Sequence, residues 1–259
     1  MAPAAWAHNY SFVDIDYPGI ATTLNDIRGL NNRGQIVGSY TSGGRQYAFI
    51  KNGGMYSTLS LPGTSNIAWG INDDGQVVGA YDNHGYIYNT SNSNLTTIDV
   101  PGNLGNTAVW GINDAGKISG HYWISMNSAF IYDGSYWTLL NKVGATATNA
   151  FGINDAGTIA GNYTMDGHDY GFTYYDGGFH DLNVPQAQNT RPVGINDHGD
   201  IVGRYWNDGG TIYGFVYHDG KFETLTMPGA EIVRVLGINN AGQIVLLCHK
   251  LMSSGSLIR

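Results

Sequence analysis

The chain has 259 residues, of which 12% are charged, and its formal net charge is −8. Lys and Arg total 12 and form no basic run, which argues against binding to nucleic acid. No apolar stretch reaches about 18 residues, so the sequence predicts no membrane-spanning segment. The 38 glycines and 18 tyrosines suit tight turns and strands better than long helices, and the length allows one large domain with its own core.

The first residues contain Ala5-Trp6-Ala7, which has the A-x-A form that ends a secretory signal. Residues 1–9 are therefore either a leader or signal remnant, or a cloning leader or chance match. The first interpretation predicts a secreted or periplasmic protein. Cys248 is the only cysteine, which excludes a disulfide within the chain and a cysteine-based metal site.

One phrase recurs six times along the chain. The copies are GLNNRGQIVGSY from Gly29, GINDDGQVVGAY from Gly70, GINDAGKISGHY from Gly111, GINDAGTIAGNY from Gly152, GINDHGDIVGRY from Gly194 and GINNAGQIVLLCH from Gly237. Their first glycines lie 41, 41, 41, 42 and 43 residues apart. A period near 40 in a β-rich chain indicates a toroidal or stacked repeat.

The unit at residues 148–184 predicts four strands. These are residues 148–154, 158–164, 170–176 and 177–184, with a tight turn at 155–157 and a loop at 165–169. In the turn, Asn or Asp caps its own backbone and glycine takes a positive φ. Four short strands per repeat are typical of a β-propeller blade. We therefore expect an all-β, six-bladed β-propeller of four-stranded antiparallel blades, formed by residues 10–259 as one domain.

The two ends of the repeat array differ from the middle. Residues 12–19, FVDIDYPG, match the predicted fourth-strand sequence TIDVPG at 97–102. An N-terminal strand that completes the last blade would close the ring and remove its free edges. In the last copy, Leu246, Leu247 and Cys248 replace the Gly-x-Tyr of the other copies. Either closure is irregular there or the reading frame is truncated.

The phrase GIN-[DN]-x-G-x-[IV]-V-G-x-Y resembles the extracellular HAF-type repeat family. This resemblance covers all but the first 10 or so residues and the irregular tail, and it implies an exported β-propeller-like protein. The strand order is also similar to that of NHL-type and calcium-dependent hydrolase propellers, which is an analogy of fold alone.

The repeated turns share one end of the blades, and at the other end the copies diverge. We expect the functional site on that variable face. Oxygen donors precede the innermost strands, and they include Asp26, Asn66, Asn149 and Glu231. Calcium-dependent hydrolase propellers hold their ion in that place with Glu, Asp and Asn, so the similarity implies Ca²⁺ in the central channel. Alternatively, these side chains cap turns.

Histidines and carboxylates on or beside the variable face predict proton transfer. His168 lies within Asp166-Gly167-His168-Asp169, and His121 stands where the other copies carry Ser, Ala, Asn or Arg. A histidine beside carboxylates can act as a general base or a metal ligand. His121, His168, Asp166 and Asp169 are the candidate catalytic residues, although each histidine could instead be a solvated loop residue.

Aromatic and cationic residues predict a substrate-binding surface. Trp69, Trp110 and Phe151 precede the repeated glycine in three adjacent copies, while Trp123 and Trp206 begin variable loops. These rings could stack on a sugar or hold an apolar substrate, or they could be inter-blade core. The opposite side of the ring carries Arg28, Arg191, Arg204 and Arg234, which suits an anionic or ester substrate.

Two functions follow from these residues. The first is a secreted hydrolase that uses a channel-bound divalent ion on an ester, lactone or phosphoester. The second is a non-catalytic propeller that recognises glycans or a protein partner. Both interpretations predict a monomer with a small-molecule or glycan ligand at the variable face.

Overall fold

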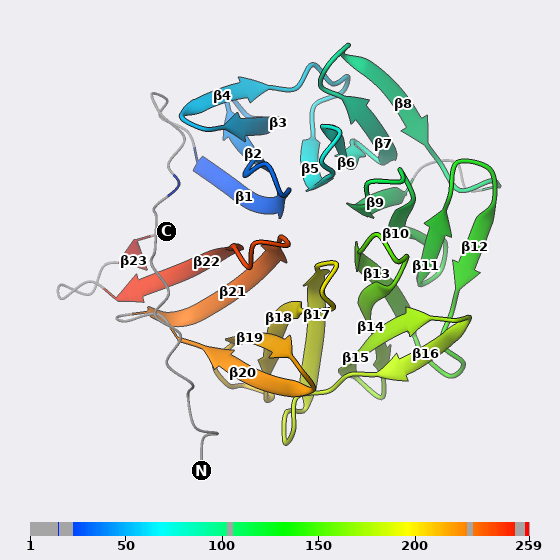
Figure 1. The fold of residues 1–259 in the computed structure, drawn as a ribbon, viewed down its shortest axis with the longest axis vertical. Coiled ribbons are helices and arrows are strands. Elements are labelled where there is room, and N and C mark those ends of the chain that lie inside the picture. The colour runs from blue at the N-terminus through cyan, green and yellow to red at the C-terminus, as the bar shows by residue number, and fades with distance from the viewer. Residues whose placement is uncertain (1–14, 16–22, 103–105, 227–229, 252–256, 259) are drawn as a thin grey trace.

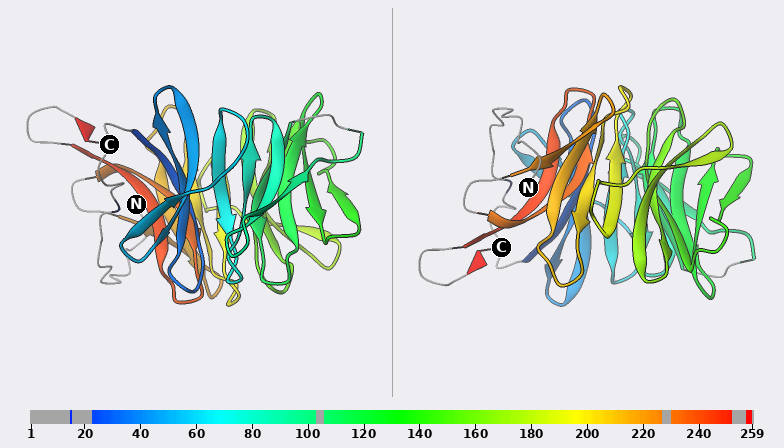
Figure 2. Two further views of the ribbon diagram at one scale, coloured as in Figure 1. Left: turned by 90° about the horizontal axis from the view of Figure 1, so that it is seen from above. Right: turned by 90° about the horizontal axis from the view of Figure 1, so that it is seen from below.

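The computed structural model describes residues 15, 23–102, 106–226, 230–251 and 257–258. This part of the chain forms six antiparallel sheets arranged around a central axis (Figure 1). The first strand of every sheet contacts the first strands of both neighbouring sheets, so six inner strands surround the axis. The prediction of an all-β, six-bladed propeller is confirmed. Figure 2 shows the blades edge-on.

The six blades follow one another along the chain, and each is an up-and-down meander. Blade 1 contains β1 (Thr23–Leu30), β2 (Ile36–Ser42), β3 (Arg45–Asn52) and β4 (Met55–Thr58). Blade 2 contains β5 (Asn66–Ile71), β6 (Gln76–Tyr81), β7 (His84–Asn89) and β8 (Asn94–Ile98). Blade 3 contains β9 (Thr107–Ile112), β10 (Ile118–Trp123), β11 (Asn127–Tyr132) and β12 (Trp137–Leu140).

The remaining blades repeat this plan until the chain ends. Blade 4 contains β13 (Ala147–Ile153), β14 (Ile159–Met165), β15 (His168–Tyr175) and β16 (Gly178–Asp181). Blade 5 contains β17 (Asn189–Ile195), β18 (Ile201–Trp206), β19 (Tyr213–His218) and β20 (Lys221–Leu225). Blade 6 contains β21 (Ala230–Ile238), β22 (Ile244–Leu251) and β23 (Leu257–Ile258).

Blade 6 has three strands among the described residues, and the two-residue β23 pairs with Lys250 and Leu251 of β22. The predicted closing strand at residues 12–16 lies outside the described residues except for Ile15. Ile15 packs beside the apolar cluster that joins blades 1 and 6. Ring closure by the N-terminal strand therefore stays a prediction, as does a leader at residues 1–9, which also lies outside the described part.

The predicted loop at residues 165–169 is wrong, because the strands continue almost to the tip of the hairpin. Met165 pairs with His168, which leaves a two-residue turn of Asp166 and Gly167. Both turn residues have positive φ, 51° and 83°, as the tight hairpin turns that match strand twist require. His168 and Asp169 are consequently the first residues of β15 rather than loop residues.

Two repeated glycines are explained by close backbone approach. A Cβ at Gly152 in β13 would lie 3.0 Å from the Cα of Gly194 in the next inner strand. A Cβ at Gly161 in β14 would lie 2.8 Å from the ring of Phe172 and would collide with the carbonyl oxygen of Asn149. These glycines let six inner strands converge on the axis and accommodate the register shift between β13 and β14.

The hydrophobic core consists of six clusters, and each cluster joins two adjacent blades. Five of the six clusters contain a fully buried aromatic ring from the third strand of a blade, whereas the cluster between blades 5 and 6 is aliphatic. These rings are Phe49, Tyr86, Phe130, Phe172 and Phe215. The cluster between blades 6 and 1 is built in the same way, from residues that include Ile27, Phe49, Leu236 and Val245. Apolar packing is therefore continuous around the ring.

A closed ring of side-chain hydrogen bonds also joins the blades. In each repeated turn, an asparagine Nδ2 donates to the backbone carbonyl of the equivalent asparagine in the next blade, at 3.0–3.2 Å. The six residues are Asn31, Asn72, Asn113, Asn154, Asn196 and Asn239, all buried. We call these six residues the ring asparagines. The side-chain Oδ1 of each also accepts a backbone N–H from its own turn, at about 2.9 Å. Each asparagine therefore closes its turn and holds the next blade.

No helix in the described part of the chain is long and apolar enough to cross a membrane.

We expect Asn154→Ala to destabilise the protein by about 2 kcal/mol or more, because it leaves the Thr158 N–H and the Asn196 carbonyl without their partner. Urea unfolding would measure the loss. The matched control is Asn92→Ala, since exposed Asn92 accepts a bond only within its own hairpin, from Asn94. Equal losses for both variants would contradict a structural role for the inter-blade ring.

Candidate ligand-binding site

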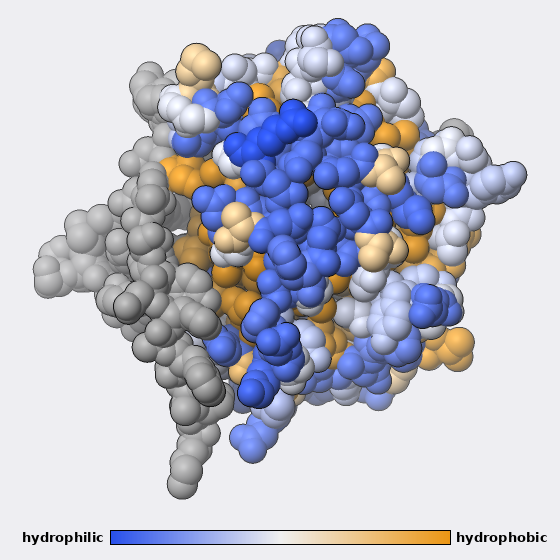
Figure 3. All heavy atoms as spheres, in the orientation of Figure 1, coloured by the Kyte–Doolittle hydropathy of each residue, from blue (hydrophilic) through white to orange (hydrophobic). Residues whose placement is uncertain are grey.

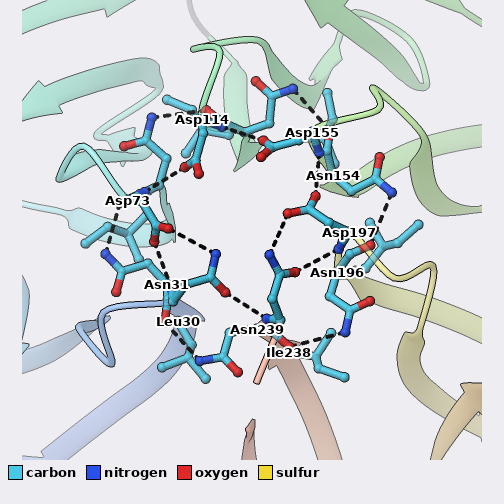
Figure 4. Close-up of a pocket in the computed structure, with 18 residues that line it drawn as sticks. Leu30, Asn31, Asp73, Asp114, Asn154, Asp155, Asn196, Asp197, Ile238 and Asn239 are labelled. Atoms are coloured by element: carbon cyan, nitrogen blue, oxygen red, sulfur yellow. Dashed lines mark hydrogen bonds between the residues drawn. The ribbon is translucent and has the colours of Figure 1, made fainter. Parts of the chain in front are cut away.

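The central channel opens at two mouths, and the repeated turns form the one that faces the viewer in Figure 1. We call this end the turn mouth. Here the residue after each ring asparagine accepts a hydrogen bond through its side-chain Oδ1, at 2.7–2.9 Å, and the donor is the backbone N–H of the equivalent residue in the preceding blade. These six residues are Asn32, Asp73, Asp114, Asp155, Asp197 and Asn240, and their side chains surround a cavity of about 70 Å³ (Figure 4). Hydrophilic residues cover the centre of this face (Figure 3).

The four carboxylates at the turn mouth repel one another. Burial, and then the charges of Asp73, Asp155 and Asp197, raise the pKa of Asp114 against the opposing effect of the N–H from Asp73. The side chain of Asp114 is nevertheless exposed. The side-chain oxygens at this mouth are largely occupied by the hydrogen bonds that join the blades. We therefore call it a charged structural seam, meaning a joint between blades whose negative charges reduce the stability of the fold.

The middle of the channel is filled by side chains. Trp69 and Trp110 stack with ring centroids 4.3 Å apart and planes 2° apart, and Phe151 meets Trp110 edge-on at 5.0 Å. The guanidinium of Arg28 lies over Trp110, 4.8 Å from its centroid. The cavity in this layer measures about 80 Å³, far below the size of a site for a drug-sized ligand. Trp69 and Trp110, both predicted to bind substrate, chiefly pack against each other.

At the other end of the channel, cross-strand pairs from the first two strands of each blade occupy one layer of the ring, and we call this end the arginine mouth. Paired residues on neighbouring antiparallel strands point to the same face of the sheet. The six pairs in blade order are Asp26 with Ser39, Ile67 with Ala80, Ala108 with His121, Asn149 with Asn162, Arg191 with Arg204, and Arg234 with Leu247. Polar side chains thus occupy blades 3 to 6 and blade 1.

Four arginines meet at this mouth from three consecutive blades. Burial, and then repulsion from Arg191, Arg234 and Arg28, lowers the pKa of Arg204 to about 10, with a smaller opposing effect of Asp169. The predicted set of Arg28, Arg191 and Arg234 is therefore brought together. Sequence comparison of the repeats also pointed to Arg204, which stands where blades 3 and 4 carry His121 and Asn162.

Two aspartates offset part of this positive charge. Asp26 is ion-paired with Arg28. Asp169, buried to 7% exposure, is ion-paired with Arg191 and accepts a 2.8 Å hydrogen bond from Thr164 Oγ1. In the described part of the chain, Arg204 and Arg234 are in no ion pair, so the four arginines and two aspartates together carry two excess positive charges. The protein as a whole carries −8.

Three polar side-chain atoms near the arginines are buried without a hydrogen-bond partner among the described residues. They are Trp110 Nε1, His121 Nδ1 and Asn162 Nδ2. The His121 ring lies 5.7 Å from the Trp110 ring, and burial lowers the pKa of His121 to about 4, so the imidazole is neutral at pH 7. Asn162 is fully buried and accepts a 3.3 Å bond from Asn149 through its other side-chain atom.

The four candidate catalytic residues lie on two blades and serve different contacts. His121 belongs to β10, whereas Asp166, His168 and Asp169 belong to blade 4. Asp166 is exposed at the hairpin tip, and His168 Nδ1 lies 3.8 Å from Asp208 Oδ2 in blade 5. Within the described residues, no hydrogen bond or ion pair links any of these four to another. Their catalytic role stays a prediction.

The candidate metal ligands are placed differently from one another. Asn66 begins β5 one position before the cross-strand layer of the arginine mouth, and its side-chain amide nitrogen donates to the carbonyls of Pro62 at 2.7 Å and Ser65 at 3.3 Å. At the same position, Thr107, Thr148 and Thr190 accept backbone N–H groups of the chain entering from the preceding blade. Asn66 therefore contacts that crossover, in line with the capping alternative, and its role as a metal ligand stays a prediction.

Asp26 and Asn149 do occupy equivalent positions in the cross-strand layer of the arginine mouth, while the side chain of Glu231 lies outside the described residues. Asp26 is taken up by Arg28, and Asn149 by Asn127 and Asn162. Across the residues that the structure describes, no group of three or more His, Cys, Asp or Glu side chains is placed to hold a metal ion. Calcium binding stays a prediction.

The two tryptophans predicted at the variable face end strands β10 and β18. Trp123 is 51% exposed, and Ile124 and Met126 beside it are also exposed. Trp206 lies 5.5 Å from the Arg191 guanidinium, which covers one part of its ring. Both tryptophans thus lie at the end of the blades that carries the arginine mouth.

No protein-family model matches the chain, and no curated protein matches it in sequence. Solved structures of propellers do match. One is a streptogramin B lyase, with 10% identity, a TM-score of 0.54, and coverage of 90% of this chain and 81% of the lyase. Another is the β-propeller domain of the Trilobed protease from Pyrococcus furiosus, with 12% identity, a TM-score of 0.58, and coverage of 89% and 76%.

A third match is the six-bladed Aleuria aurantia lectin, with 14% identity, a TM-score of 0.52, and coverage of 89% of this chain and 88% of the lectin. At such identities the likeness shows the fold alone. These propellers include enzymes and a sugar-binding protein, so the fold is compatible with catalysis and with binding.

We expect Asp114→Asn to stabilise the protein at pH 7 by roughly 0.5 kcal/mol, a value discounted for the exposure of the side chain. Asparagine keeps the acceptor for the Asp73 N–H, as Asn32 and Asn240 do in their blades, but removes a charge that the fold disfavours. A carboxyl whose pKa is raised in the folded state destabilises the protein when it is ionised. The gain therefore shrinks as the pH falls through that raised pKa, and it is lost below the unfolded-state pKa of about 4.

Thermal unfolding between pH 3 and pH 8 would measure this gain. Asp114→Ala, which removes both charge and acceptor, is the control and should lose stability. An asparagine variant less stable than the parent protein at pH 7 would contradict the assignment of this mouth as a charged structural seam.

Proposed function

We propose that the protein is a ligand-binding propeller that takes an anionic small molecule or glycan at the arginine mouth. The observation that carries the proposal is the proximity of three partly buried arginines, Arg28, Arg191 and Arg204, to one another and to exposed Arg234, with only two carboxylates paired to them. Burial is the main cause of the lowered pKa of Arg204, and repulsion by the other three arginines lowers that pKa further. A bound anion would offset that repulsion.

The chemistry of arginine narrows the kind of anion. Its planar guanidinium donates two parallel hydrogen bonds to a carboxylate or phosphate, and such charge-assisted bonds are about twice as strong as neutral ones. Arg28 and Arg191 already have carboxylate partners, so Arg204 and Arg234 are the residues that would bind the ligand. Asp26 and Asp169 would then hold their neighbours in position rather than touch the ligand.

The matched structures are consistent with this role without assigning it. The Aleuria aurantia lectin is a six-bladed propeller that recognises fucose, so this architecture can bind a sugar. Membership of the HAF-type repeat family, suggested by the GIND phrase, also belongs to the proposal and would imply export. A secreted or periplasmic location and a monomeric state stay predictions.

A hydrolase that uses channel-bound Ca²⁺ is the second candidate. Its oxygen donors Asp26 and Asn149 are engaged by protein partners, and His121, with a pKa of about 4, is a weak base at neutral pH. These contacts favour binding over hydrolysis. The lyase and protease propellers among the matched structures keep an enzyme open, so the experiment includes calcium.

The test is isothermal titration calorimetry with citrate and inorganic phosphate at matched ionic strength. We expect saturable binding of one anion, weakened about 10-fold or more by Arg204→Gln, because a hydrogen bond to a charged group contributes about 1.5–3 kcal/mol. The control is Arg33→Gln, which removes the same charge from an exposed position at the turn mouth. No binding, or equal losses in both variants, would contradict the proposal.

The calcium arm uses the same protein with Ca²⁺ or a chelator. A calcium-dependent rise in thermal stability that Asp26→Asn abolishes would support the hydrolase instead, since a ligand bound by the folded state alone raises stability. The proposed function predicts no such rise.

A further inference from the structure

We infer that the ligand is an acidic sugar, a uronate, whose carboxylate binds Arg204 and Arg234 and whose hydroxyl groups bind buried donors on blades 3 and 4. This inference rests on the proposed function and specifies its ligand. It follows from the unpartnered atoms Trp110 Nε1, His121 Nδ1 and Asn162 Nδ2, which the anion site alone does not explain.

The unpartnered atoms belong to blades 3 and 4, which continue around the ring from blade 5 and its arginines. His121, Asn162 and Arg204 stand at the same position of the second strand in blades 3, 4 and 5, and Trp110 lies beside His121. A ligand held by Arg204 and Arg234 on blades 5 and 6 therefore faces blades 3 and 4 across the mouth. An ion no larger than a carboxylate would leave those two blades without a partner.

The donor set points to hydroxyl oxygens. The indole N–H and the amide NH₂ only donate, and the neutral imidazole can donate or accept through Nδ1. A hydroxyl group both accepts and donates, so it can satisfy all three. Neither blade 3 nor blade 4 contributes an arginine or lysine to this layer, so a second anionic group would find no countercharge there.

Buried donors without partners make free energy available for binding. Each such group in a folded protein costs about 1–3 kcal/mol, and native structures contain few of them. Because Trp110 Nε1 and Asn162 Nδ2 have almost no solvent contact, side chains that cover them must move when the ligand enters. The exposed ring of Trp123 and the partly exposed ring of Trp206 at the same end offer flat apolar faces for the C–H groups of a sugar.

Four probes separate the charge from the hydroxyl groups. They are D-glucuronate and D-galacturonate, which carry both, D-glucose, which lacks the carboxylate, and cyclohexanecarboxylate, which lacks the hydroxyl groups. Calorimetry should rank at least one uronate about 10-fold or more above cyclohexanecarboxylate, with glucose weakest. Equal affinity for uronates and cyclohexanecarboxylate would overturn the sugar while leaving the anion site, whereas no affinity for any carboxylate would overturn the proposed function itself.

Two variants then test the donors. Trp110→Phe keeps an aromatic ring against Trp69 and Phe151 but removes Nε1–H, and Asn162→Leu removes the amide at similar volume. Both should lower uronate affinity several-fold and leave cyclohexanecarboxylate affinity unchanged. The control is Trp137→Phe, since Trp137 lies on the outer strand of blade 3 and stacks on Tyr132.

A loss that is equal for both ligands would indicate a packing role and contradict the inference. If Asn162→Leu fails to fold, Trp110→Phe still decides the question, because it leaves the neighbouring backbone bonds intact.

Discussion

The structure depends on one constraint, which is that six blades must be held at a constant angle around an axis. Each ring asparagine contributes to this arrangement with one side chain. Its Nδ2 donates a hydrogen bond to the next blade, and its Oδ1 accepts one from its own turn. Asn239 Nδ2 donates to the Asn31 carbonyl, so these hydrogen bonds join the last copy of the repeat to the first without any contribution from the outer strands. A buried asparagine that satisfies both of its polar atoms in this way is hard to replace, because any smaller residue leaves two backbone groups unpaired.

This constraint divides the channel between structure and function. At the turn mouth, the side-chain oxygens of the ring residues accept backbone N–H groups of the preceding blade, so little is left there to contact a ligand. At the arginine mouth, the same strands carry different residues in different blades. The tryptophan stack separates the two ends. Divergence among the copies is therefore a physical guide to where a ligand can be recognised.

Much of this could be predicted from the sequence, because the period and the turn residues act locally. The blade count and the turn at Asp155–Gly157 follow from one repeated phrase, and divergence among its copies predicts which face carries the candidate site. Side-chain direction could not be predicted as well, since a shift of one residue in register reverses it. Asn66 and Asn149 look alike in sequence, yet Asn149 bonds to Asn162 on the neighbouring strand of its blade, whereas Asn66 bonds to the crossover before its strand. Asp169, predicted as catalytic, is bound by Arg191 from the next blade, a contact between distant residues that no local pattern reveals. Asn162 was missed because asparagine is common in these repeats, although its place beside His121 was the available signal.

The central claim is that the blades are joined in a closed hydrogen-bonded ring, and native-state amide hydrogen exchange tests it most directly. The amides to follow are those that donate to the next blade, at residues 32, 73, 114, 155, 197 and 240. If the ring is closed, all six exchange only by global unfolding and give one common free energy, although they lie in surface turns. Markedly faster exchange at Asn240, whose N–H donates to Asn32, than at the other five would show that the ring is open between the last blade and the first, and would contradict the account.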